Sequence, residues 1–430
     1  MKYVLCFVCL ALFMMGCDSS SIEDPGKTHF IRFYGTGGDQ TGQDFVVLPD
    51  GSMILFGTTR PTQPTKGTQW YLVKVDPQGA VIWEKEFGGV NNEEARDIEL
   101  TSGGQIVLVG NYYRGANRDV KIMTLTLNGD SINSALFAVR DDFGNPSNGD
   151  EDVTSVSETS DGFLIAGSTT YVYTVGKPAG TGIDLRDALK IRVFTDLTEY
   201  PNSWTQSIGY VADDVSQKII QVSPTEFYFF GYTDNLPVGQ SITNYNFWVY
   251  RLGANGDPDT SPIYPGTVSG NERLTSFCLT PSGYFLGGLS QGGTTSDLFI
   301  TDVLIPEPGP LGFVQGDIFY EKTLSINLGS SLPAKTSVFP SNQGGFLVLG
   351  DENGFDNNQN WLLSKVNDDG SPAWDYHIVF GGEGLDNCGA VQELPDGRLV
   401  IVGTMRTGRP DAGEFKLTLM KVSAAGKLEN

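Results

Sequence analysis

Carboxylic acids recur at one position of this chain, just ahead of a short apolar segment that returns along the sequence. A carboxyl at such a place can transfer protons during glycoside hydrolysis, or it can hold a cation through its oxygens. Adjacent carboxylates repel one another unless a cation offsets their charge. The acids at this position are Glu93, Glu94, Glu151, Asp152, Asp213, Asp214, Glu272 and Asp386.

Two interpretations of these acids remain open. In the first, they form a ring around the centre of the fold and bind a cation or a basic peptide, or they supply the carboxylates of a hydrolase or lyase. In the second, each acid accepts hydrogen bonds from backbone N–H groups of its own turn, which is the commoner use of such residues. The adjacent pairs are the strongest candidates for binding, namely Glu151 with Asp152 and Asp213 with Asp214.

The patterns of most other catalytic and metal sites are missing from the sequence. Beyond the first residues the chain has two histidines, His29 and His377, and both fall in predicted outer strands. No nucleophile elbow, zinc-protease motif, Walker loop or paired-cysteine zinc motif occurs. The sequence therefore favours a non-catalytic protein without a cofactor. Calcium stays an alternative, because Asp141–Asp152 and Asp351–Asn360 are rich in oxygen ligands, although neither has the spacing of an EF-hand.

Two long segments between predicted strands provide a second set of candidates. Residues 168–188 and 232–246 are longer than the corresponding segment 111–118, and long loops are uncommon in compact domains unless they have a function. Tyrosines on such loops suit sugar or peptide binding. The predicted binding residues are Tyr171, Tyr173, Tyr232 and Tyr245.

The elements that must position these residues come from a pattern that returns seven times. Each copy has a turn such as Pro-Asp-Gly-Ser, an apolar run that ends in glycine, and two further β-type runs, and Asp-Gly turns between apolar runs indicate hairpins. A period of 53 to 64 residues with four strands predicts an all-β protein, a seven-bladed β-propeller of four-stranded antiparallel blades. The glycines that end the apolar runs are Gly57, Gly110, Gly167, Gly231, Gly288, Gly350 and Gly403.

The two ends of the propeller are predicted to meet in one blade. The seventh copy has only three strands, whereas the segment Phe30–Gly38 resembles the missing outer strand. The N-terminal strand should therefore close the last blade, which leaves no long open edge. Aromatic residues at fixed offsets should pack between neighbouring blades rather than form a sugar-binding stripe. These are Trp70, Phe247 and Trp361 in third strands, and Trp83, Trp204 and Trp374 in outer strands.

The front of the chain predicts where the protein is located. Residues 1–16 read as a bacterial secretion signal, whose apolar run of about 12 residues is too short for the roughly 20 of a membrane span. Residues 14–17, Met-Met-Gly-Cys, resemble the lipobox of bacterial lipoproteins, which implies a lipid such as palmitate on Cys17. Residues 17–28 would then be a polar tether, and residues 29–430 the propeller. We expect a cell-envelope protein held to the membrane through this lipid only, at the outer membrane or cell surface.

Charge and cysteine content agree with this location. The net charge of −23 argues against nucleic acid as a partner. Cys278 and Cys388 fall in the fifth and seventh copies, too far apart for a disulfide, so both should be free thiols.

The repeats resemble those of bacterial secreted or lipid-anchored propellers, near the quinoprotein-like and WD40-like superfamilies. Their pattern is approximately W-x-K-x-F-G-G, then D-G-G-x-x-x-x-G, then K-x-D-x-x-G. The resemblance implies the fold and an envelope location but no shared reaction, since propellers carry many functions. The prediction is a lipoprotein that binds an envelope protein or a glycan. The alternative is a carbohydrate-active hydrolase or lyase that uses the acids listed above.

Overall fold

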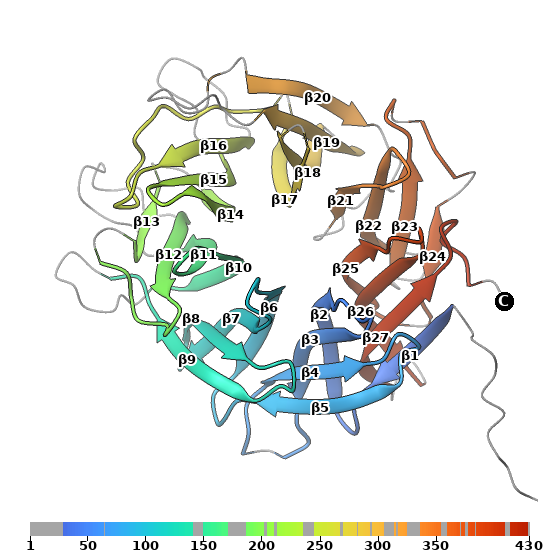
Figure 1. Cartoon of the computed structure of the whole chain (residues 1–430). Coiled ribbons are helices and arrows are strands. Elements are labelled where there is room, and N and C mark those ends of the chain that lie inside the picture. Colours follow the sequence, from blue (N-terminus) through green and yellow to red (C-terminus); the bar gives the residue numbers. More distant parts are fainter. Residues whose placement is uncertain are drawn as a thin grey trace, which may run out of the picture.

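The computed structural model describes residues 29–63, 65–140, 149–170, 186–201, 204–209, 213–234, 245–266, 270–281, 283–292, 295–304, 314, 317–324, 336–353, 359–369, 371–374, 377–382, 384–408 and 413–428. Within these ranges, 27 β-strands form seven antiparallel sheets around a central axis (Figure 1). The protein is the predicted all-β, seven-bladed propeller. No helix in the described ranges is long and apolar enough to cross a membrane.

Each blade runs outward from an inner strand beside the axis to an outer strand at the rim (Figure 1). Blade 1 contains β2 (Asp39–Val47), β3 (Met53–Arg60), β4 (Gln69–Val75) and β5 (Val81–Phe87). Blade 2 contains β6 (Glu93–Leu100), β7 (Ile106–Arg114), β8 (Asn117–Leu125) and β9 (Ser131–Phe137). Blade 3 contains β10 (Glu151–Glu158), β11 (Gly162–Thr169), β12 (Asp187–Phe194) and β13 (Gln206–Ile208).

The remaining blades follow the same order. Blade 4 contains β14 (Asp214–Ser223), β15 (Glu226–Thr233) and β16 (Asn246–Leu252), and its rim position is taken by a segment that bridges β16 through Pro258 and Ile263. Blade 5 contains β17 (Glu272–Thr280), β18 (Gly283–Gly292), β19 (Thr295–Leu304) and β20 (Ile318–Leu324). Blade 6 contains β21 (Ser337–Pro340), β22 (Phe346–Asn353), β23 (Gln359–Val366) and β24 (Ile378–Phe380).

Blade 7 joins the two ends of the chain, as predicted. It contains β25 (Asn387–Glu393), β26 (Leu399–Thr407), β27 (Glu414–Val422) and, at the rim, β1 (Phe30–Tyr34). β1 pairs antiparallel with β27, from Phe30 opposite Lys421 to Tyr34 opposite Leu417. The hydroxyl of Tyr34 also donates to the carbonyl of Gly79 in blade 1, so the closing strand is tied to its neighbour.

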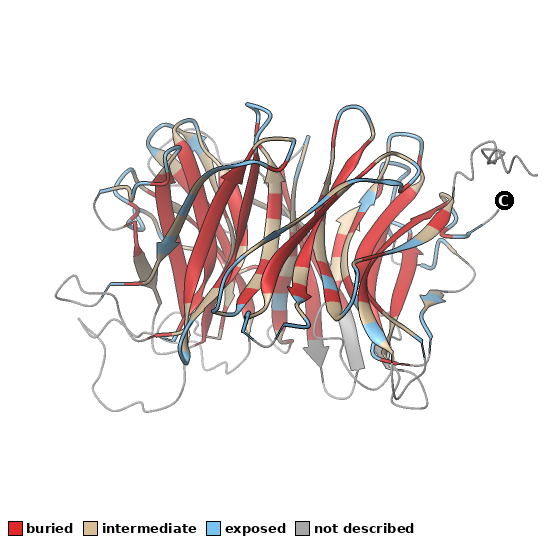
Figure 2. Ribbon diagram, turned by 90° about the horizontal axis from the view of Figure 1, so that it is seen from below, coloured by how far each residue is buried: buried red, intermediate tan, exposed pale blue. Residues whose placement is uncertain are grey.

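In blade 1 the second strand begins with an apolar run that ends at its glycine, and neighbouring blades cover both faces of this run. Residues 53–56 in blade 1 are at most 1% exposed, and Figure 2 shows buried strands running through the thickness of the ring. The preceding turn is built by its own residues. Asp50 accepts hydrogen bonds from the backbone N–H and the hydroxyl of Ser52, and Gly51 has a φ of +81°, which favours glycine.

The third-strand aromatics pack between blades, which confirms the packing interpretation. Trp70, Phe247 and Trp361 occupy the same position in their third strands. Each lies one residue before the residue that pairs with the second-strand glycine. All three are fully buried. The indole N–H of Trp70 donates to the carbonyl of Glu94 in the next blade at 3.0 Å. Trp361 donates in the same way to Thr404 at 3.1 Å.

The outer aromatics lie against glycines in the next blade. Each of these glycines ends a K-x-D-x-x-G-type turn with a φ between +73° and +84°. A Cβ on the glycine would come within 3.0 Å of the indole, so close approach as well as backbone conformation requires glycine. The pairs are Trp83 with Gly129, Trp204 with Gly256, and Trp374 with Gly426.

A repeated hydrogen bond joins inner strands to neighbouring blades. The side chain directly after a second-strand glycine accepts the N–H of an inner-strand residue in the next blade, at 2.6 to 3.0 Å. The inner strand is then bulged at the following residue. The acceptor and donor residues are Thr58 and Ala95, Asn111 and Val153, Asp351 and Cys388, and Thr404 and Gly42.

Candidate functional site

The predicted acids fall into different environments because side chains alternate along the inner strands. Glu94 and Asp152 point one way, with side chains 40% and 34% exposed. A second set of acids lies two residues before the inner-strand partner of a second-strand glycine. These acids point into the junctions between blades, and their carboxyls are withdrawn from the surface. This buried set, at most 3% exposed, contains Glu93, Glu151, Asp214, Glu272 and Asp386.

Glycines of the junctions lie directly against these buried acids. A Cβ on Gly381 would come within 2.7 Å of Asp386, and a Cβ on Gly209 within 2.7 Å of Asp214 and 2.4 Å of Asp187. The first glycine of the repeated F-G-G segment in blade 6, Gly381, therefore makes room for a buried polar side chain.

Two of the buried acids are held by neighbours in a purely local way. Asp386 accepts the backbone N–H groups of Gly382 and Arg406 at 2.9 and 2.7 Å. Glu93 forms a buried ion pair with Lys121 of the same blade. Backbone bonding within the acid's own turn, the second interpretation of the sequence, describes the bond from Gly382 to Asp386, whereas Glu93 is held by the side chain of Lys121.

Glu151 is one of the buried acids whose carboxylate has an oxygen without a hydrogen bond. One carboxylate oxygen accepts the hydroxyl of Thr169 at 3.1 Å, while its Oε2 is buried without a hydrogen bond. Burial is the main cause that raises the pKa of Glu151 to about 8, and the charge of Asp119 adds to it. At neutral pH this carboxyl is therefore mostly protonated.

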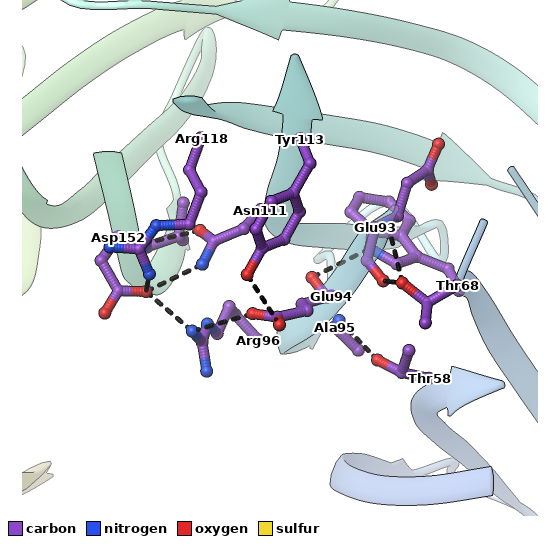
Figure 3. Close-up of polar contacts among 12 residues, drawn as sticks. Thr58, Thr68, Glu93, Glu94, Ala95, Arg96, Asn111, Tyr113, Arg118 and Asp152 are labelled. Carbon is purple, nitrogen blue, oxygen red and sulfur yellow. Dashed lines mark hydrogen bonds and ion pairs between the residues drawn. The ribbon is translucent and has the colours of Figure 1, made fainter. Parts of the chain in front are cut away.

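The half-exposed acids belong to a network that we call the mouth cluster (Figure 3). Arg96 connects its two halves, because its Nη2 donates to Asp152 Oδ1 at 2.8 Å and to Glu94 Oε2 at 3.3 Å. Asn111 Nδ2 also donates to Asp152, and the hydroxyl of Tyr113 donates to Glu94, both at 2.8 Å. The mouth cluster consists of Glu94, Arg96, Asn111, Tyr113, Arg118 and Asp152.

The mouth cluster holds Asp152 in the charged form. Burial acts to raise the pKa of Asp152, but the charge of Arg96 and the Asn111 hydrogen bond outweigh it and bring this pKa below its ordinary value. Burial and the hydrogen bond to Glu94 raise the pKa of Tyr113 to about 12. Asp152 thus presents a fixed charge, and Tyr113 keeps its hydroxyl proton for hydrogen bonding.

A recess of about 580 Å³ lies beside the mouth cluster, where blades 7, 1 and 2 meet. We call it the upper recess, because it opens on the face where the inner strands begin. Its charged groups balance, with two acids and two arginines, and one aromatic ring borders it. It is lined by Asp39, Thr41, Gln43, Thr58, Arg60, Thr68, Glu94, Ala95, Arg96 and Phe415.

Two further acids, Asp44 and Asp97, are in contact across blades 1 and 2. Asp44 Oδ2 accepts the N–H of Ile98 at 3.3 Å, Asp97 Oδ2 accepts the N–H of Val156 at 2.7 Å, and the two side chains hydrogen-bond to each other. Such a bond requires that one carboxyl keeps a proton. Burial, followed by the charge of Asp97, holds the pKa of Asp44 well above its ordinary value.

This pair is not among the acids predicted from the sequence, although the sequence contains a signal for it. Both aspartates come directly after the inner-strand bulge, two residues beyond the partners of Gly57 and Gly110. Aligning the segments Gln-Asp-Phe and Arg-Asp-Ile on these glycines would have placed Asp44 and Asp97 at the same level of adjacent blades.

The bases of the long loops in blades 3 and 4 form a second network, the loop-base cluster. Arg186 clamps Asp213 through two hydrogen bonds of 2.7 and 2.6 Å, and the hydroxyl of Tyr245 donates to the same carboxylate at 2.9 Å. Arg273 lies 4.4 Å from the ring centre of Tyr245, and Tyr232 packs edge-on against that ring. Although burial acts to raise the pKa of Asp213, Arg186 lowers it below its ordinary value.

Several predicted residues lie outside the described ranges. Tyr171 and Tyr173, Cys17, most of the calcium-candidate segment 141–152 and half of the segment 351–360 are among them. Within the described ranges, no group of three or more histidine, cysteine, aspartate or glutamate residues is arranged to hold a metal ion. Cys278 and Cys388 are free thiols, as predicted.

Comparisons with known proteins identify no family. No family model matches the chain, and no curated protein matches it. Solved structures show weak similarity: a Dyadobacter fermentans protein of unknown function (10% identity, TM-score 0.46, 91% of this chain and 97% of that one) and the periplasmic gluconolactonase PpgL of Pseudomonas aeruginosa (14%, 0.47, 79% and 85%). A puromycin hydrolase matches at 12% identity and a TM-score of 0.49, over 88% of this chain and 51% of its own. These values are too low to transfer an activity or a site.

Proposed function

We propose that this protein is a non-catalytic binding module of the bacterial cell envelope. In this proposal the chain is anchored by lipid at Cys17, at the outer membrane or cell surface. It binds an envelope protein or a glycan through the mouth cluster and the upper recess. In this proposal the loops that carry Tyr171, Tyr173, Tyr232 and Tyr245 would border the bound partner.

The observation that supports binding is the state of the half-exposed carboxylates. Asp152 and Glu94 are both paired with Arg96, and the pKa of Asp152 lies below its ordinary value. An acid–base catalyst needs a pKa close to the working pH. Oriented charges beside an open polar recess instead suit recognition of a polar ligand.

The alternative, a carbohydrate-active hydrolase or lyase, requires two carboxyls at a set separation. Retaining glycosidases hold them about 5 Å apart and inverting enzymes about 6.5–9.5 Å apart. Asp44 and Asp97 are in hydrogen-bond contact, which is closer than either arrangement. This pair therefore does not favour glycoside hydrolysis.

Site-specific photo-crosslinking in the producing bacterium tests the binding proposal. A photoreactive residue at Thr41, in the upper recess, should give one discrete adduct with an envelope protein, or retention on cell-wall polysaccharide that Thr41→Trp abolishes. The matched control is the same photoreactive residue at exposed Gln78, at the other end of blade 1. Identical adducts from both positions, or neither adduct nor retention, would refute the proposal.

Metabolic labelling tests the anchor separately. Labelled palmitate should enter the wild-type protein, and Cys17→Ala should lose the label and leave the membrane fraction. Unchanged fractionation of Cys17→Ala would remove the lipoprotein part of the proposal and leave the binding part standing.

A further inference from the structure

A second recess, of about 470 Å³, lies between blades 6 and 7 on the lower face, where the inner strands end. We call it the lower recess. Its walls include Lys365 and Asp368 from the end of the third strand of blade 6, Trp374 from the following segment, and Ala424 and Ala425 from the last turn of blade 7. It shares no residue with the upper recess.

The lysine of this recess behaves differently from its equivalents in other blades. In blade 1, Lys74 Nζ donates to the carbonyl of Leu127 in the next blade at 3.3 Å, and in blade 7, Lys421 Nζ donates to that of Pro77 at 3.1 Å. Both bonds close the junction. Lys365 is 8% exposed, yet its ammonium has no hydrogen bond or ion pair with the described residues.

The turn that faces Lys365 explains why this junction stays open. In the four-residue turns of blades 1, 2 and 7, each closed by a hydrogen bond from the glycine N–H, the second position is Pro77, Leu127 and Ala424, respectively. Alanine is the smallest of the three side chains. The same turn of blade 7 also has Ala425 where blades 1 and 2 carry longer side chains, so the space above Lys365 is not filled.

The other groups of the recess define the chemistry it can recognise. Trp374 is held by one edge against Gly426 and lines the recess with part of its indole. Asp368 also lines the recess, where it accepts the N–H of Gly345 at 3.0 Å. Its negative charge is opposite to that of Lys365. An aromatic surface, an ammonium donor and a carboxylate acceptor around a small volume match a ring with an apolar face and several hydroxyls.

We propose that the lower recess is a saccharide-binding site, in which the sugar stacks on Trp374 and its hydroxyls bind Lys365 and Asp368. A simple anion suits the site less well, because Asp368 balances Lys365 and the whole chain carries a charge of −23. The site is independent of the upper recess, so it does not rest on the function proposed above.

Saturation-transfer NMR with the full-length protein tests the site. The probes are glucose, galactose, mannose, xylose and N-acetylglucosamine, measured one at a time. We expect saturation transfer to the ring protons of at least one sugar. Lys365→Met, which keeps the apolar stem, should weaken its binding about tenfold, as expected for loss of a hydrogen bond from a charged donor. Ala424→Leu, which installs the residue of blade 2, should abolish it.

The control is Lys74→Met, which removes the equivalent lysine from a closed junction and should leave the signal unchanged. Absence of transfer from all five sugars would overturn the proposal, as would a signal that survives Ala424→Leu. If Ala424→Leu does not fold, as judged by its thermal unfolding, Lys365→Met decides alone, and unchanged affinity in that variant overturns the proposal. Variants at Thr41 in the upper recess should not affect the sugar signal, which separates this test from that of the binding proposal.

Discussion

The mouth cluster and the loop-base cluster are built from the same residue types but differ in how fully their groups are used. In the loop-base cluster one carboxylate, Asp213, receives both arms of Arg186 and the hydroxyl of Tyr245, and its side chain is 12% exposed. In the mouth cluster one guanidinium, that of Arg96, is divided between two carboxylates that are 34% and 40% exposed.

This difference is the one expected between an anchor and the proposed recognition surface. A carboxylate whose hydrogen bonds are all made within the protein gains nothing from a ligand and mainly holds the bases of its loops together. Carboxylates that share one arginine and remain partly exposed to solvent can give up part of their ion pairing with the arginine to bind a ligand. The loss of free energy is small because such half-exposed ion pairs are weak. The same residue types, Arg, Asp and Tyr, can therefore serve stability in one region and, in our proposal, binding in another.

The largest expected effect is on the anchor. Asp213→Ala leaves Arg186 without its carboxylate in a partly buried place, and should lower the free energy of unfolding by about 3 kcal/mol. Urea denaturation monitored by circular dichroism measures it. The matched control, Asp396→Ala, removes a carboxylate from an exposed pair with Arg398 and should cost no more than about 0.5 kcal/mol. Equal losses in both variants would end the distinction between an anchor and an ordinary surface pair.

A second effect concerns the protonated acid between the blades. The pKa of Glu151 in the folded protein, about 8, is above its unfolded value. The protonated side chain therefore adds to the free energy of unfolding at low pH, and this added stability is lost as the pH rises through 8. Between pH 6.5 and 8.5 the free energy of unfolding of the wild type should fall by about 2 kcal/mol, whereas that of Glu151→Gln should not show this fall. Unfolding free energies at both pH values measure this. A pH dependence unchanged in Glu151→Gln would show that another group titrates.

A smaller stability effect is expected at the mouth cluster. Arg96→Met should lower the free energy of unfolding by about 1 kcal/mol, because the pairs it removes are half exposed. The same variant should abolish the adduct formed from Thr41, whereas Asp213→Ala should retain it. If Arg96→Met destabilises the fold as much as Asp213→Ala does, the mouth cluster is a second anchor.

The smallest effect is expected beneath the mouth cluster. Asp97→Asn can keep the bond from Val156 N–H and donate to Asp44, so it imitates the protonated state of the pair. Because the pKa of Asp44 is raised in the folded protein, wild-type stability falls as pH rises from the acid range, and the variant should be about 0.5–1 kcal/mol more stable at pH 8. Thermal unfolding at pH 5 and pH 8 measures it, and a variant less stable at both would contradict a shared proton.

Much of the fold could be predicted because it depends on short-range patterns. The turn at Asp50 and Gly51 and the register of Trp70 and Trp361 follow from apolar runs and turn residues within one copy. The closing strand follows from a comparison of copies, because the last copy lacks an outer strand and the N-terminal segment resembles one. Each copy must bury both faces of its second strand in the same way. The strand assignment in one copy therefore supports the strand assignments in the others.

The candidate site could be predicted only in outline. The acids before the inner strands were recognisable, but whether a side chain enters a junction or faces outward depends on strand alternation and on where a bulge interrupts it. Glu93 and Glu94 are adjacent in sequence, yet one is buried against Lys121 and the other joins Arg96. The contact of Asp44 with Asp97 connects residues of different blades and could not be deduced from either segment alone.

The sequence by itself determined the seven repeats, the strand order within a blade and the closure of the ring, because period, glycine turns and apolar runs are local properties. The tertiary structure alone decided which acids are buried, which share an arginine and which junction leaves a lysine unengaged. Those outcomes depend on how one blade meets the next, and the electrostatic environment of a side chain is set by neighbours that lie tens of residues away in sequence.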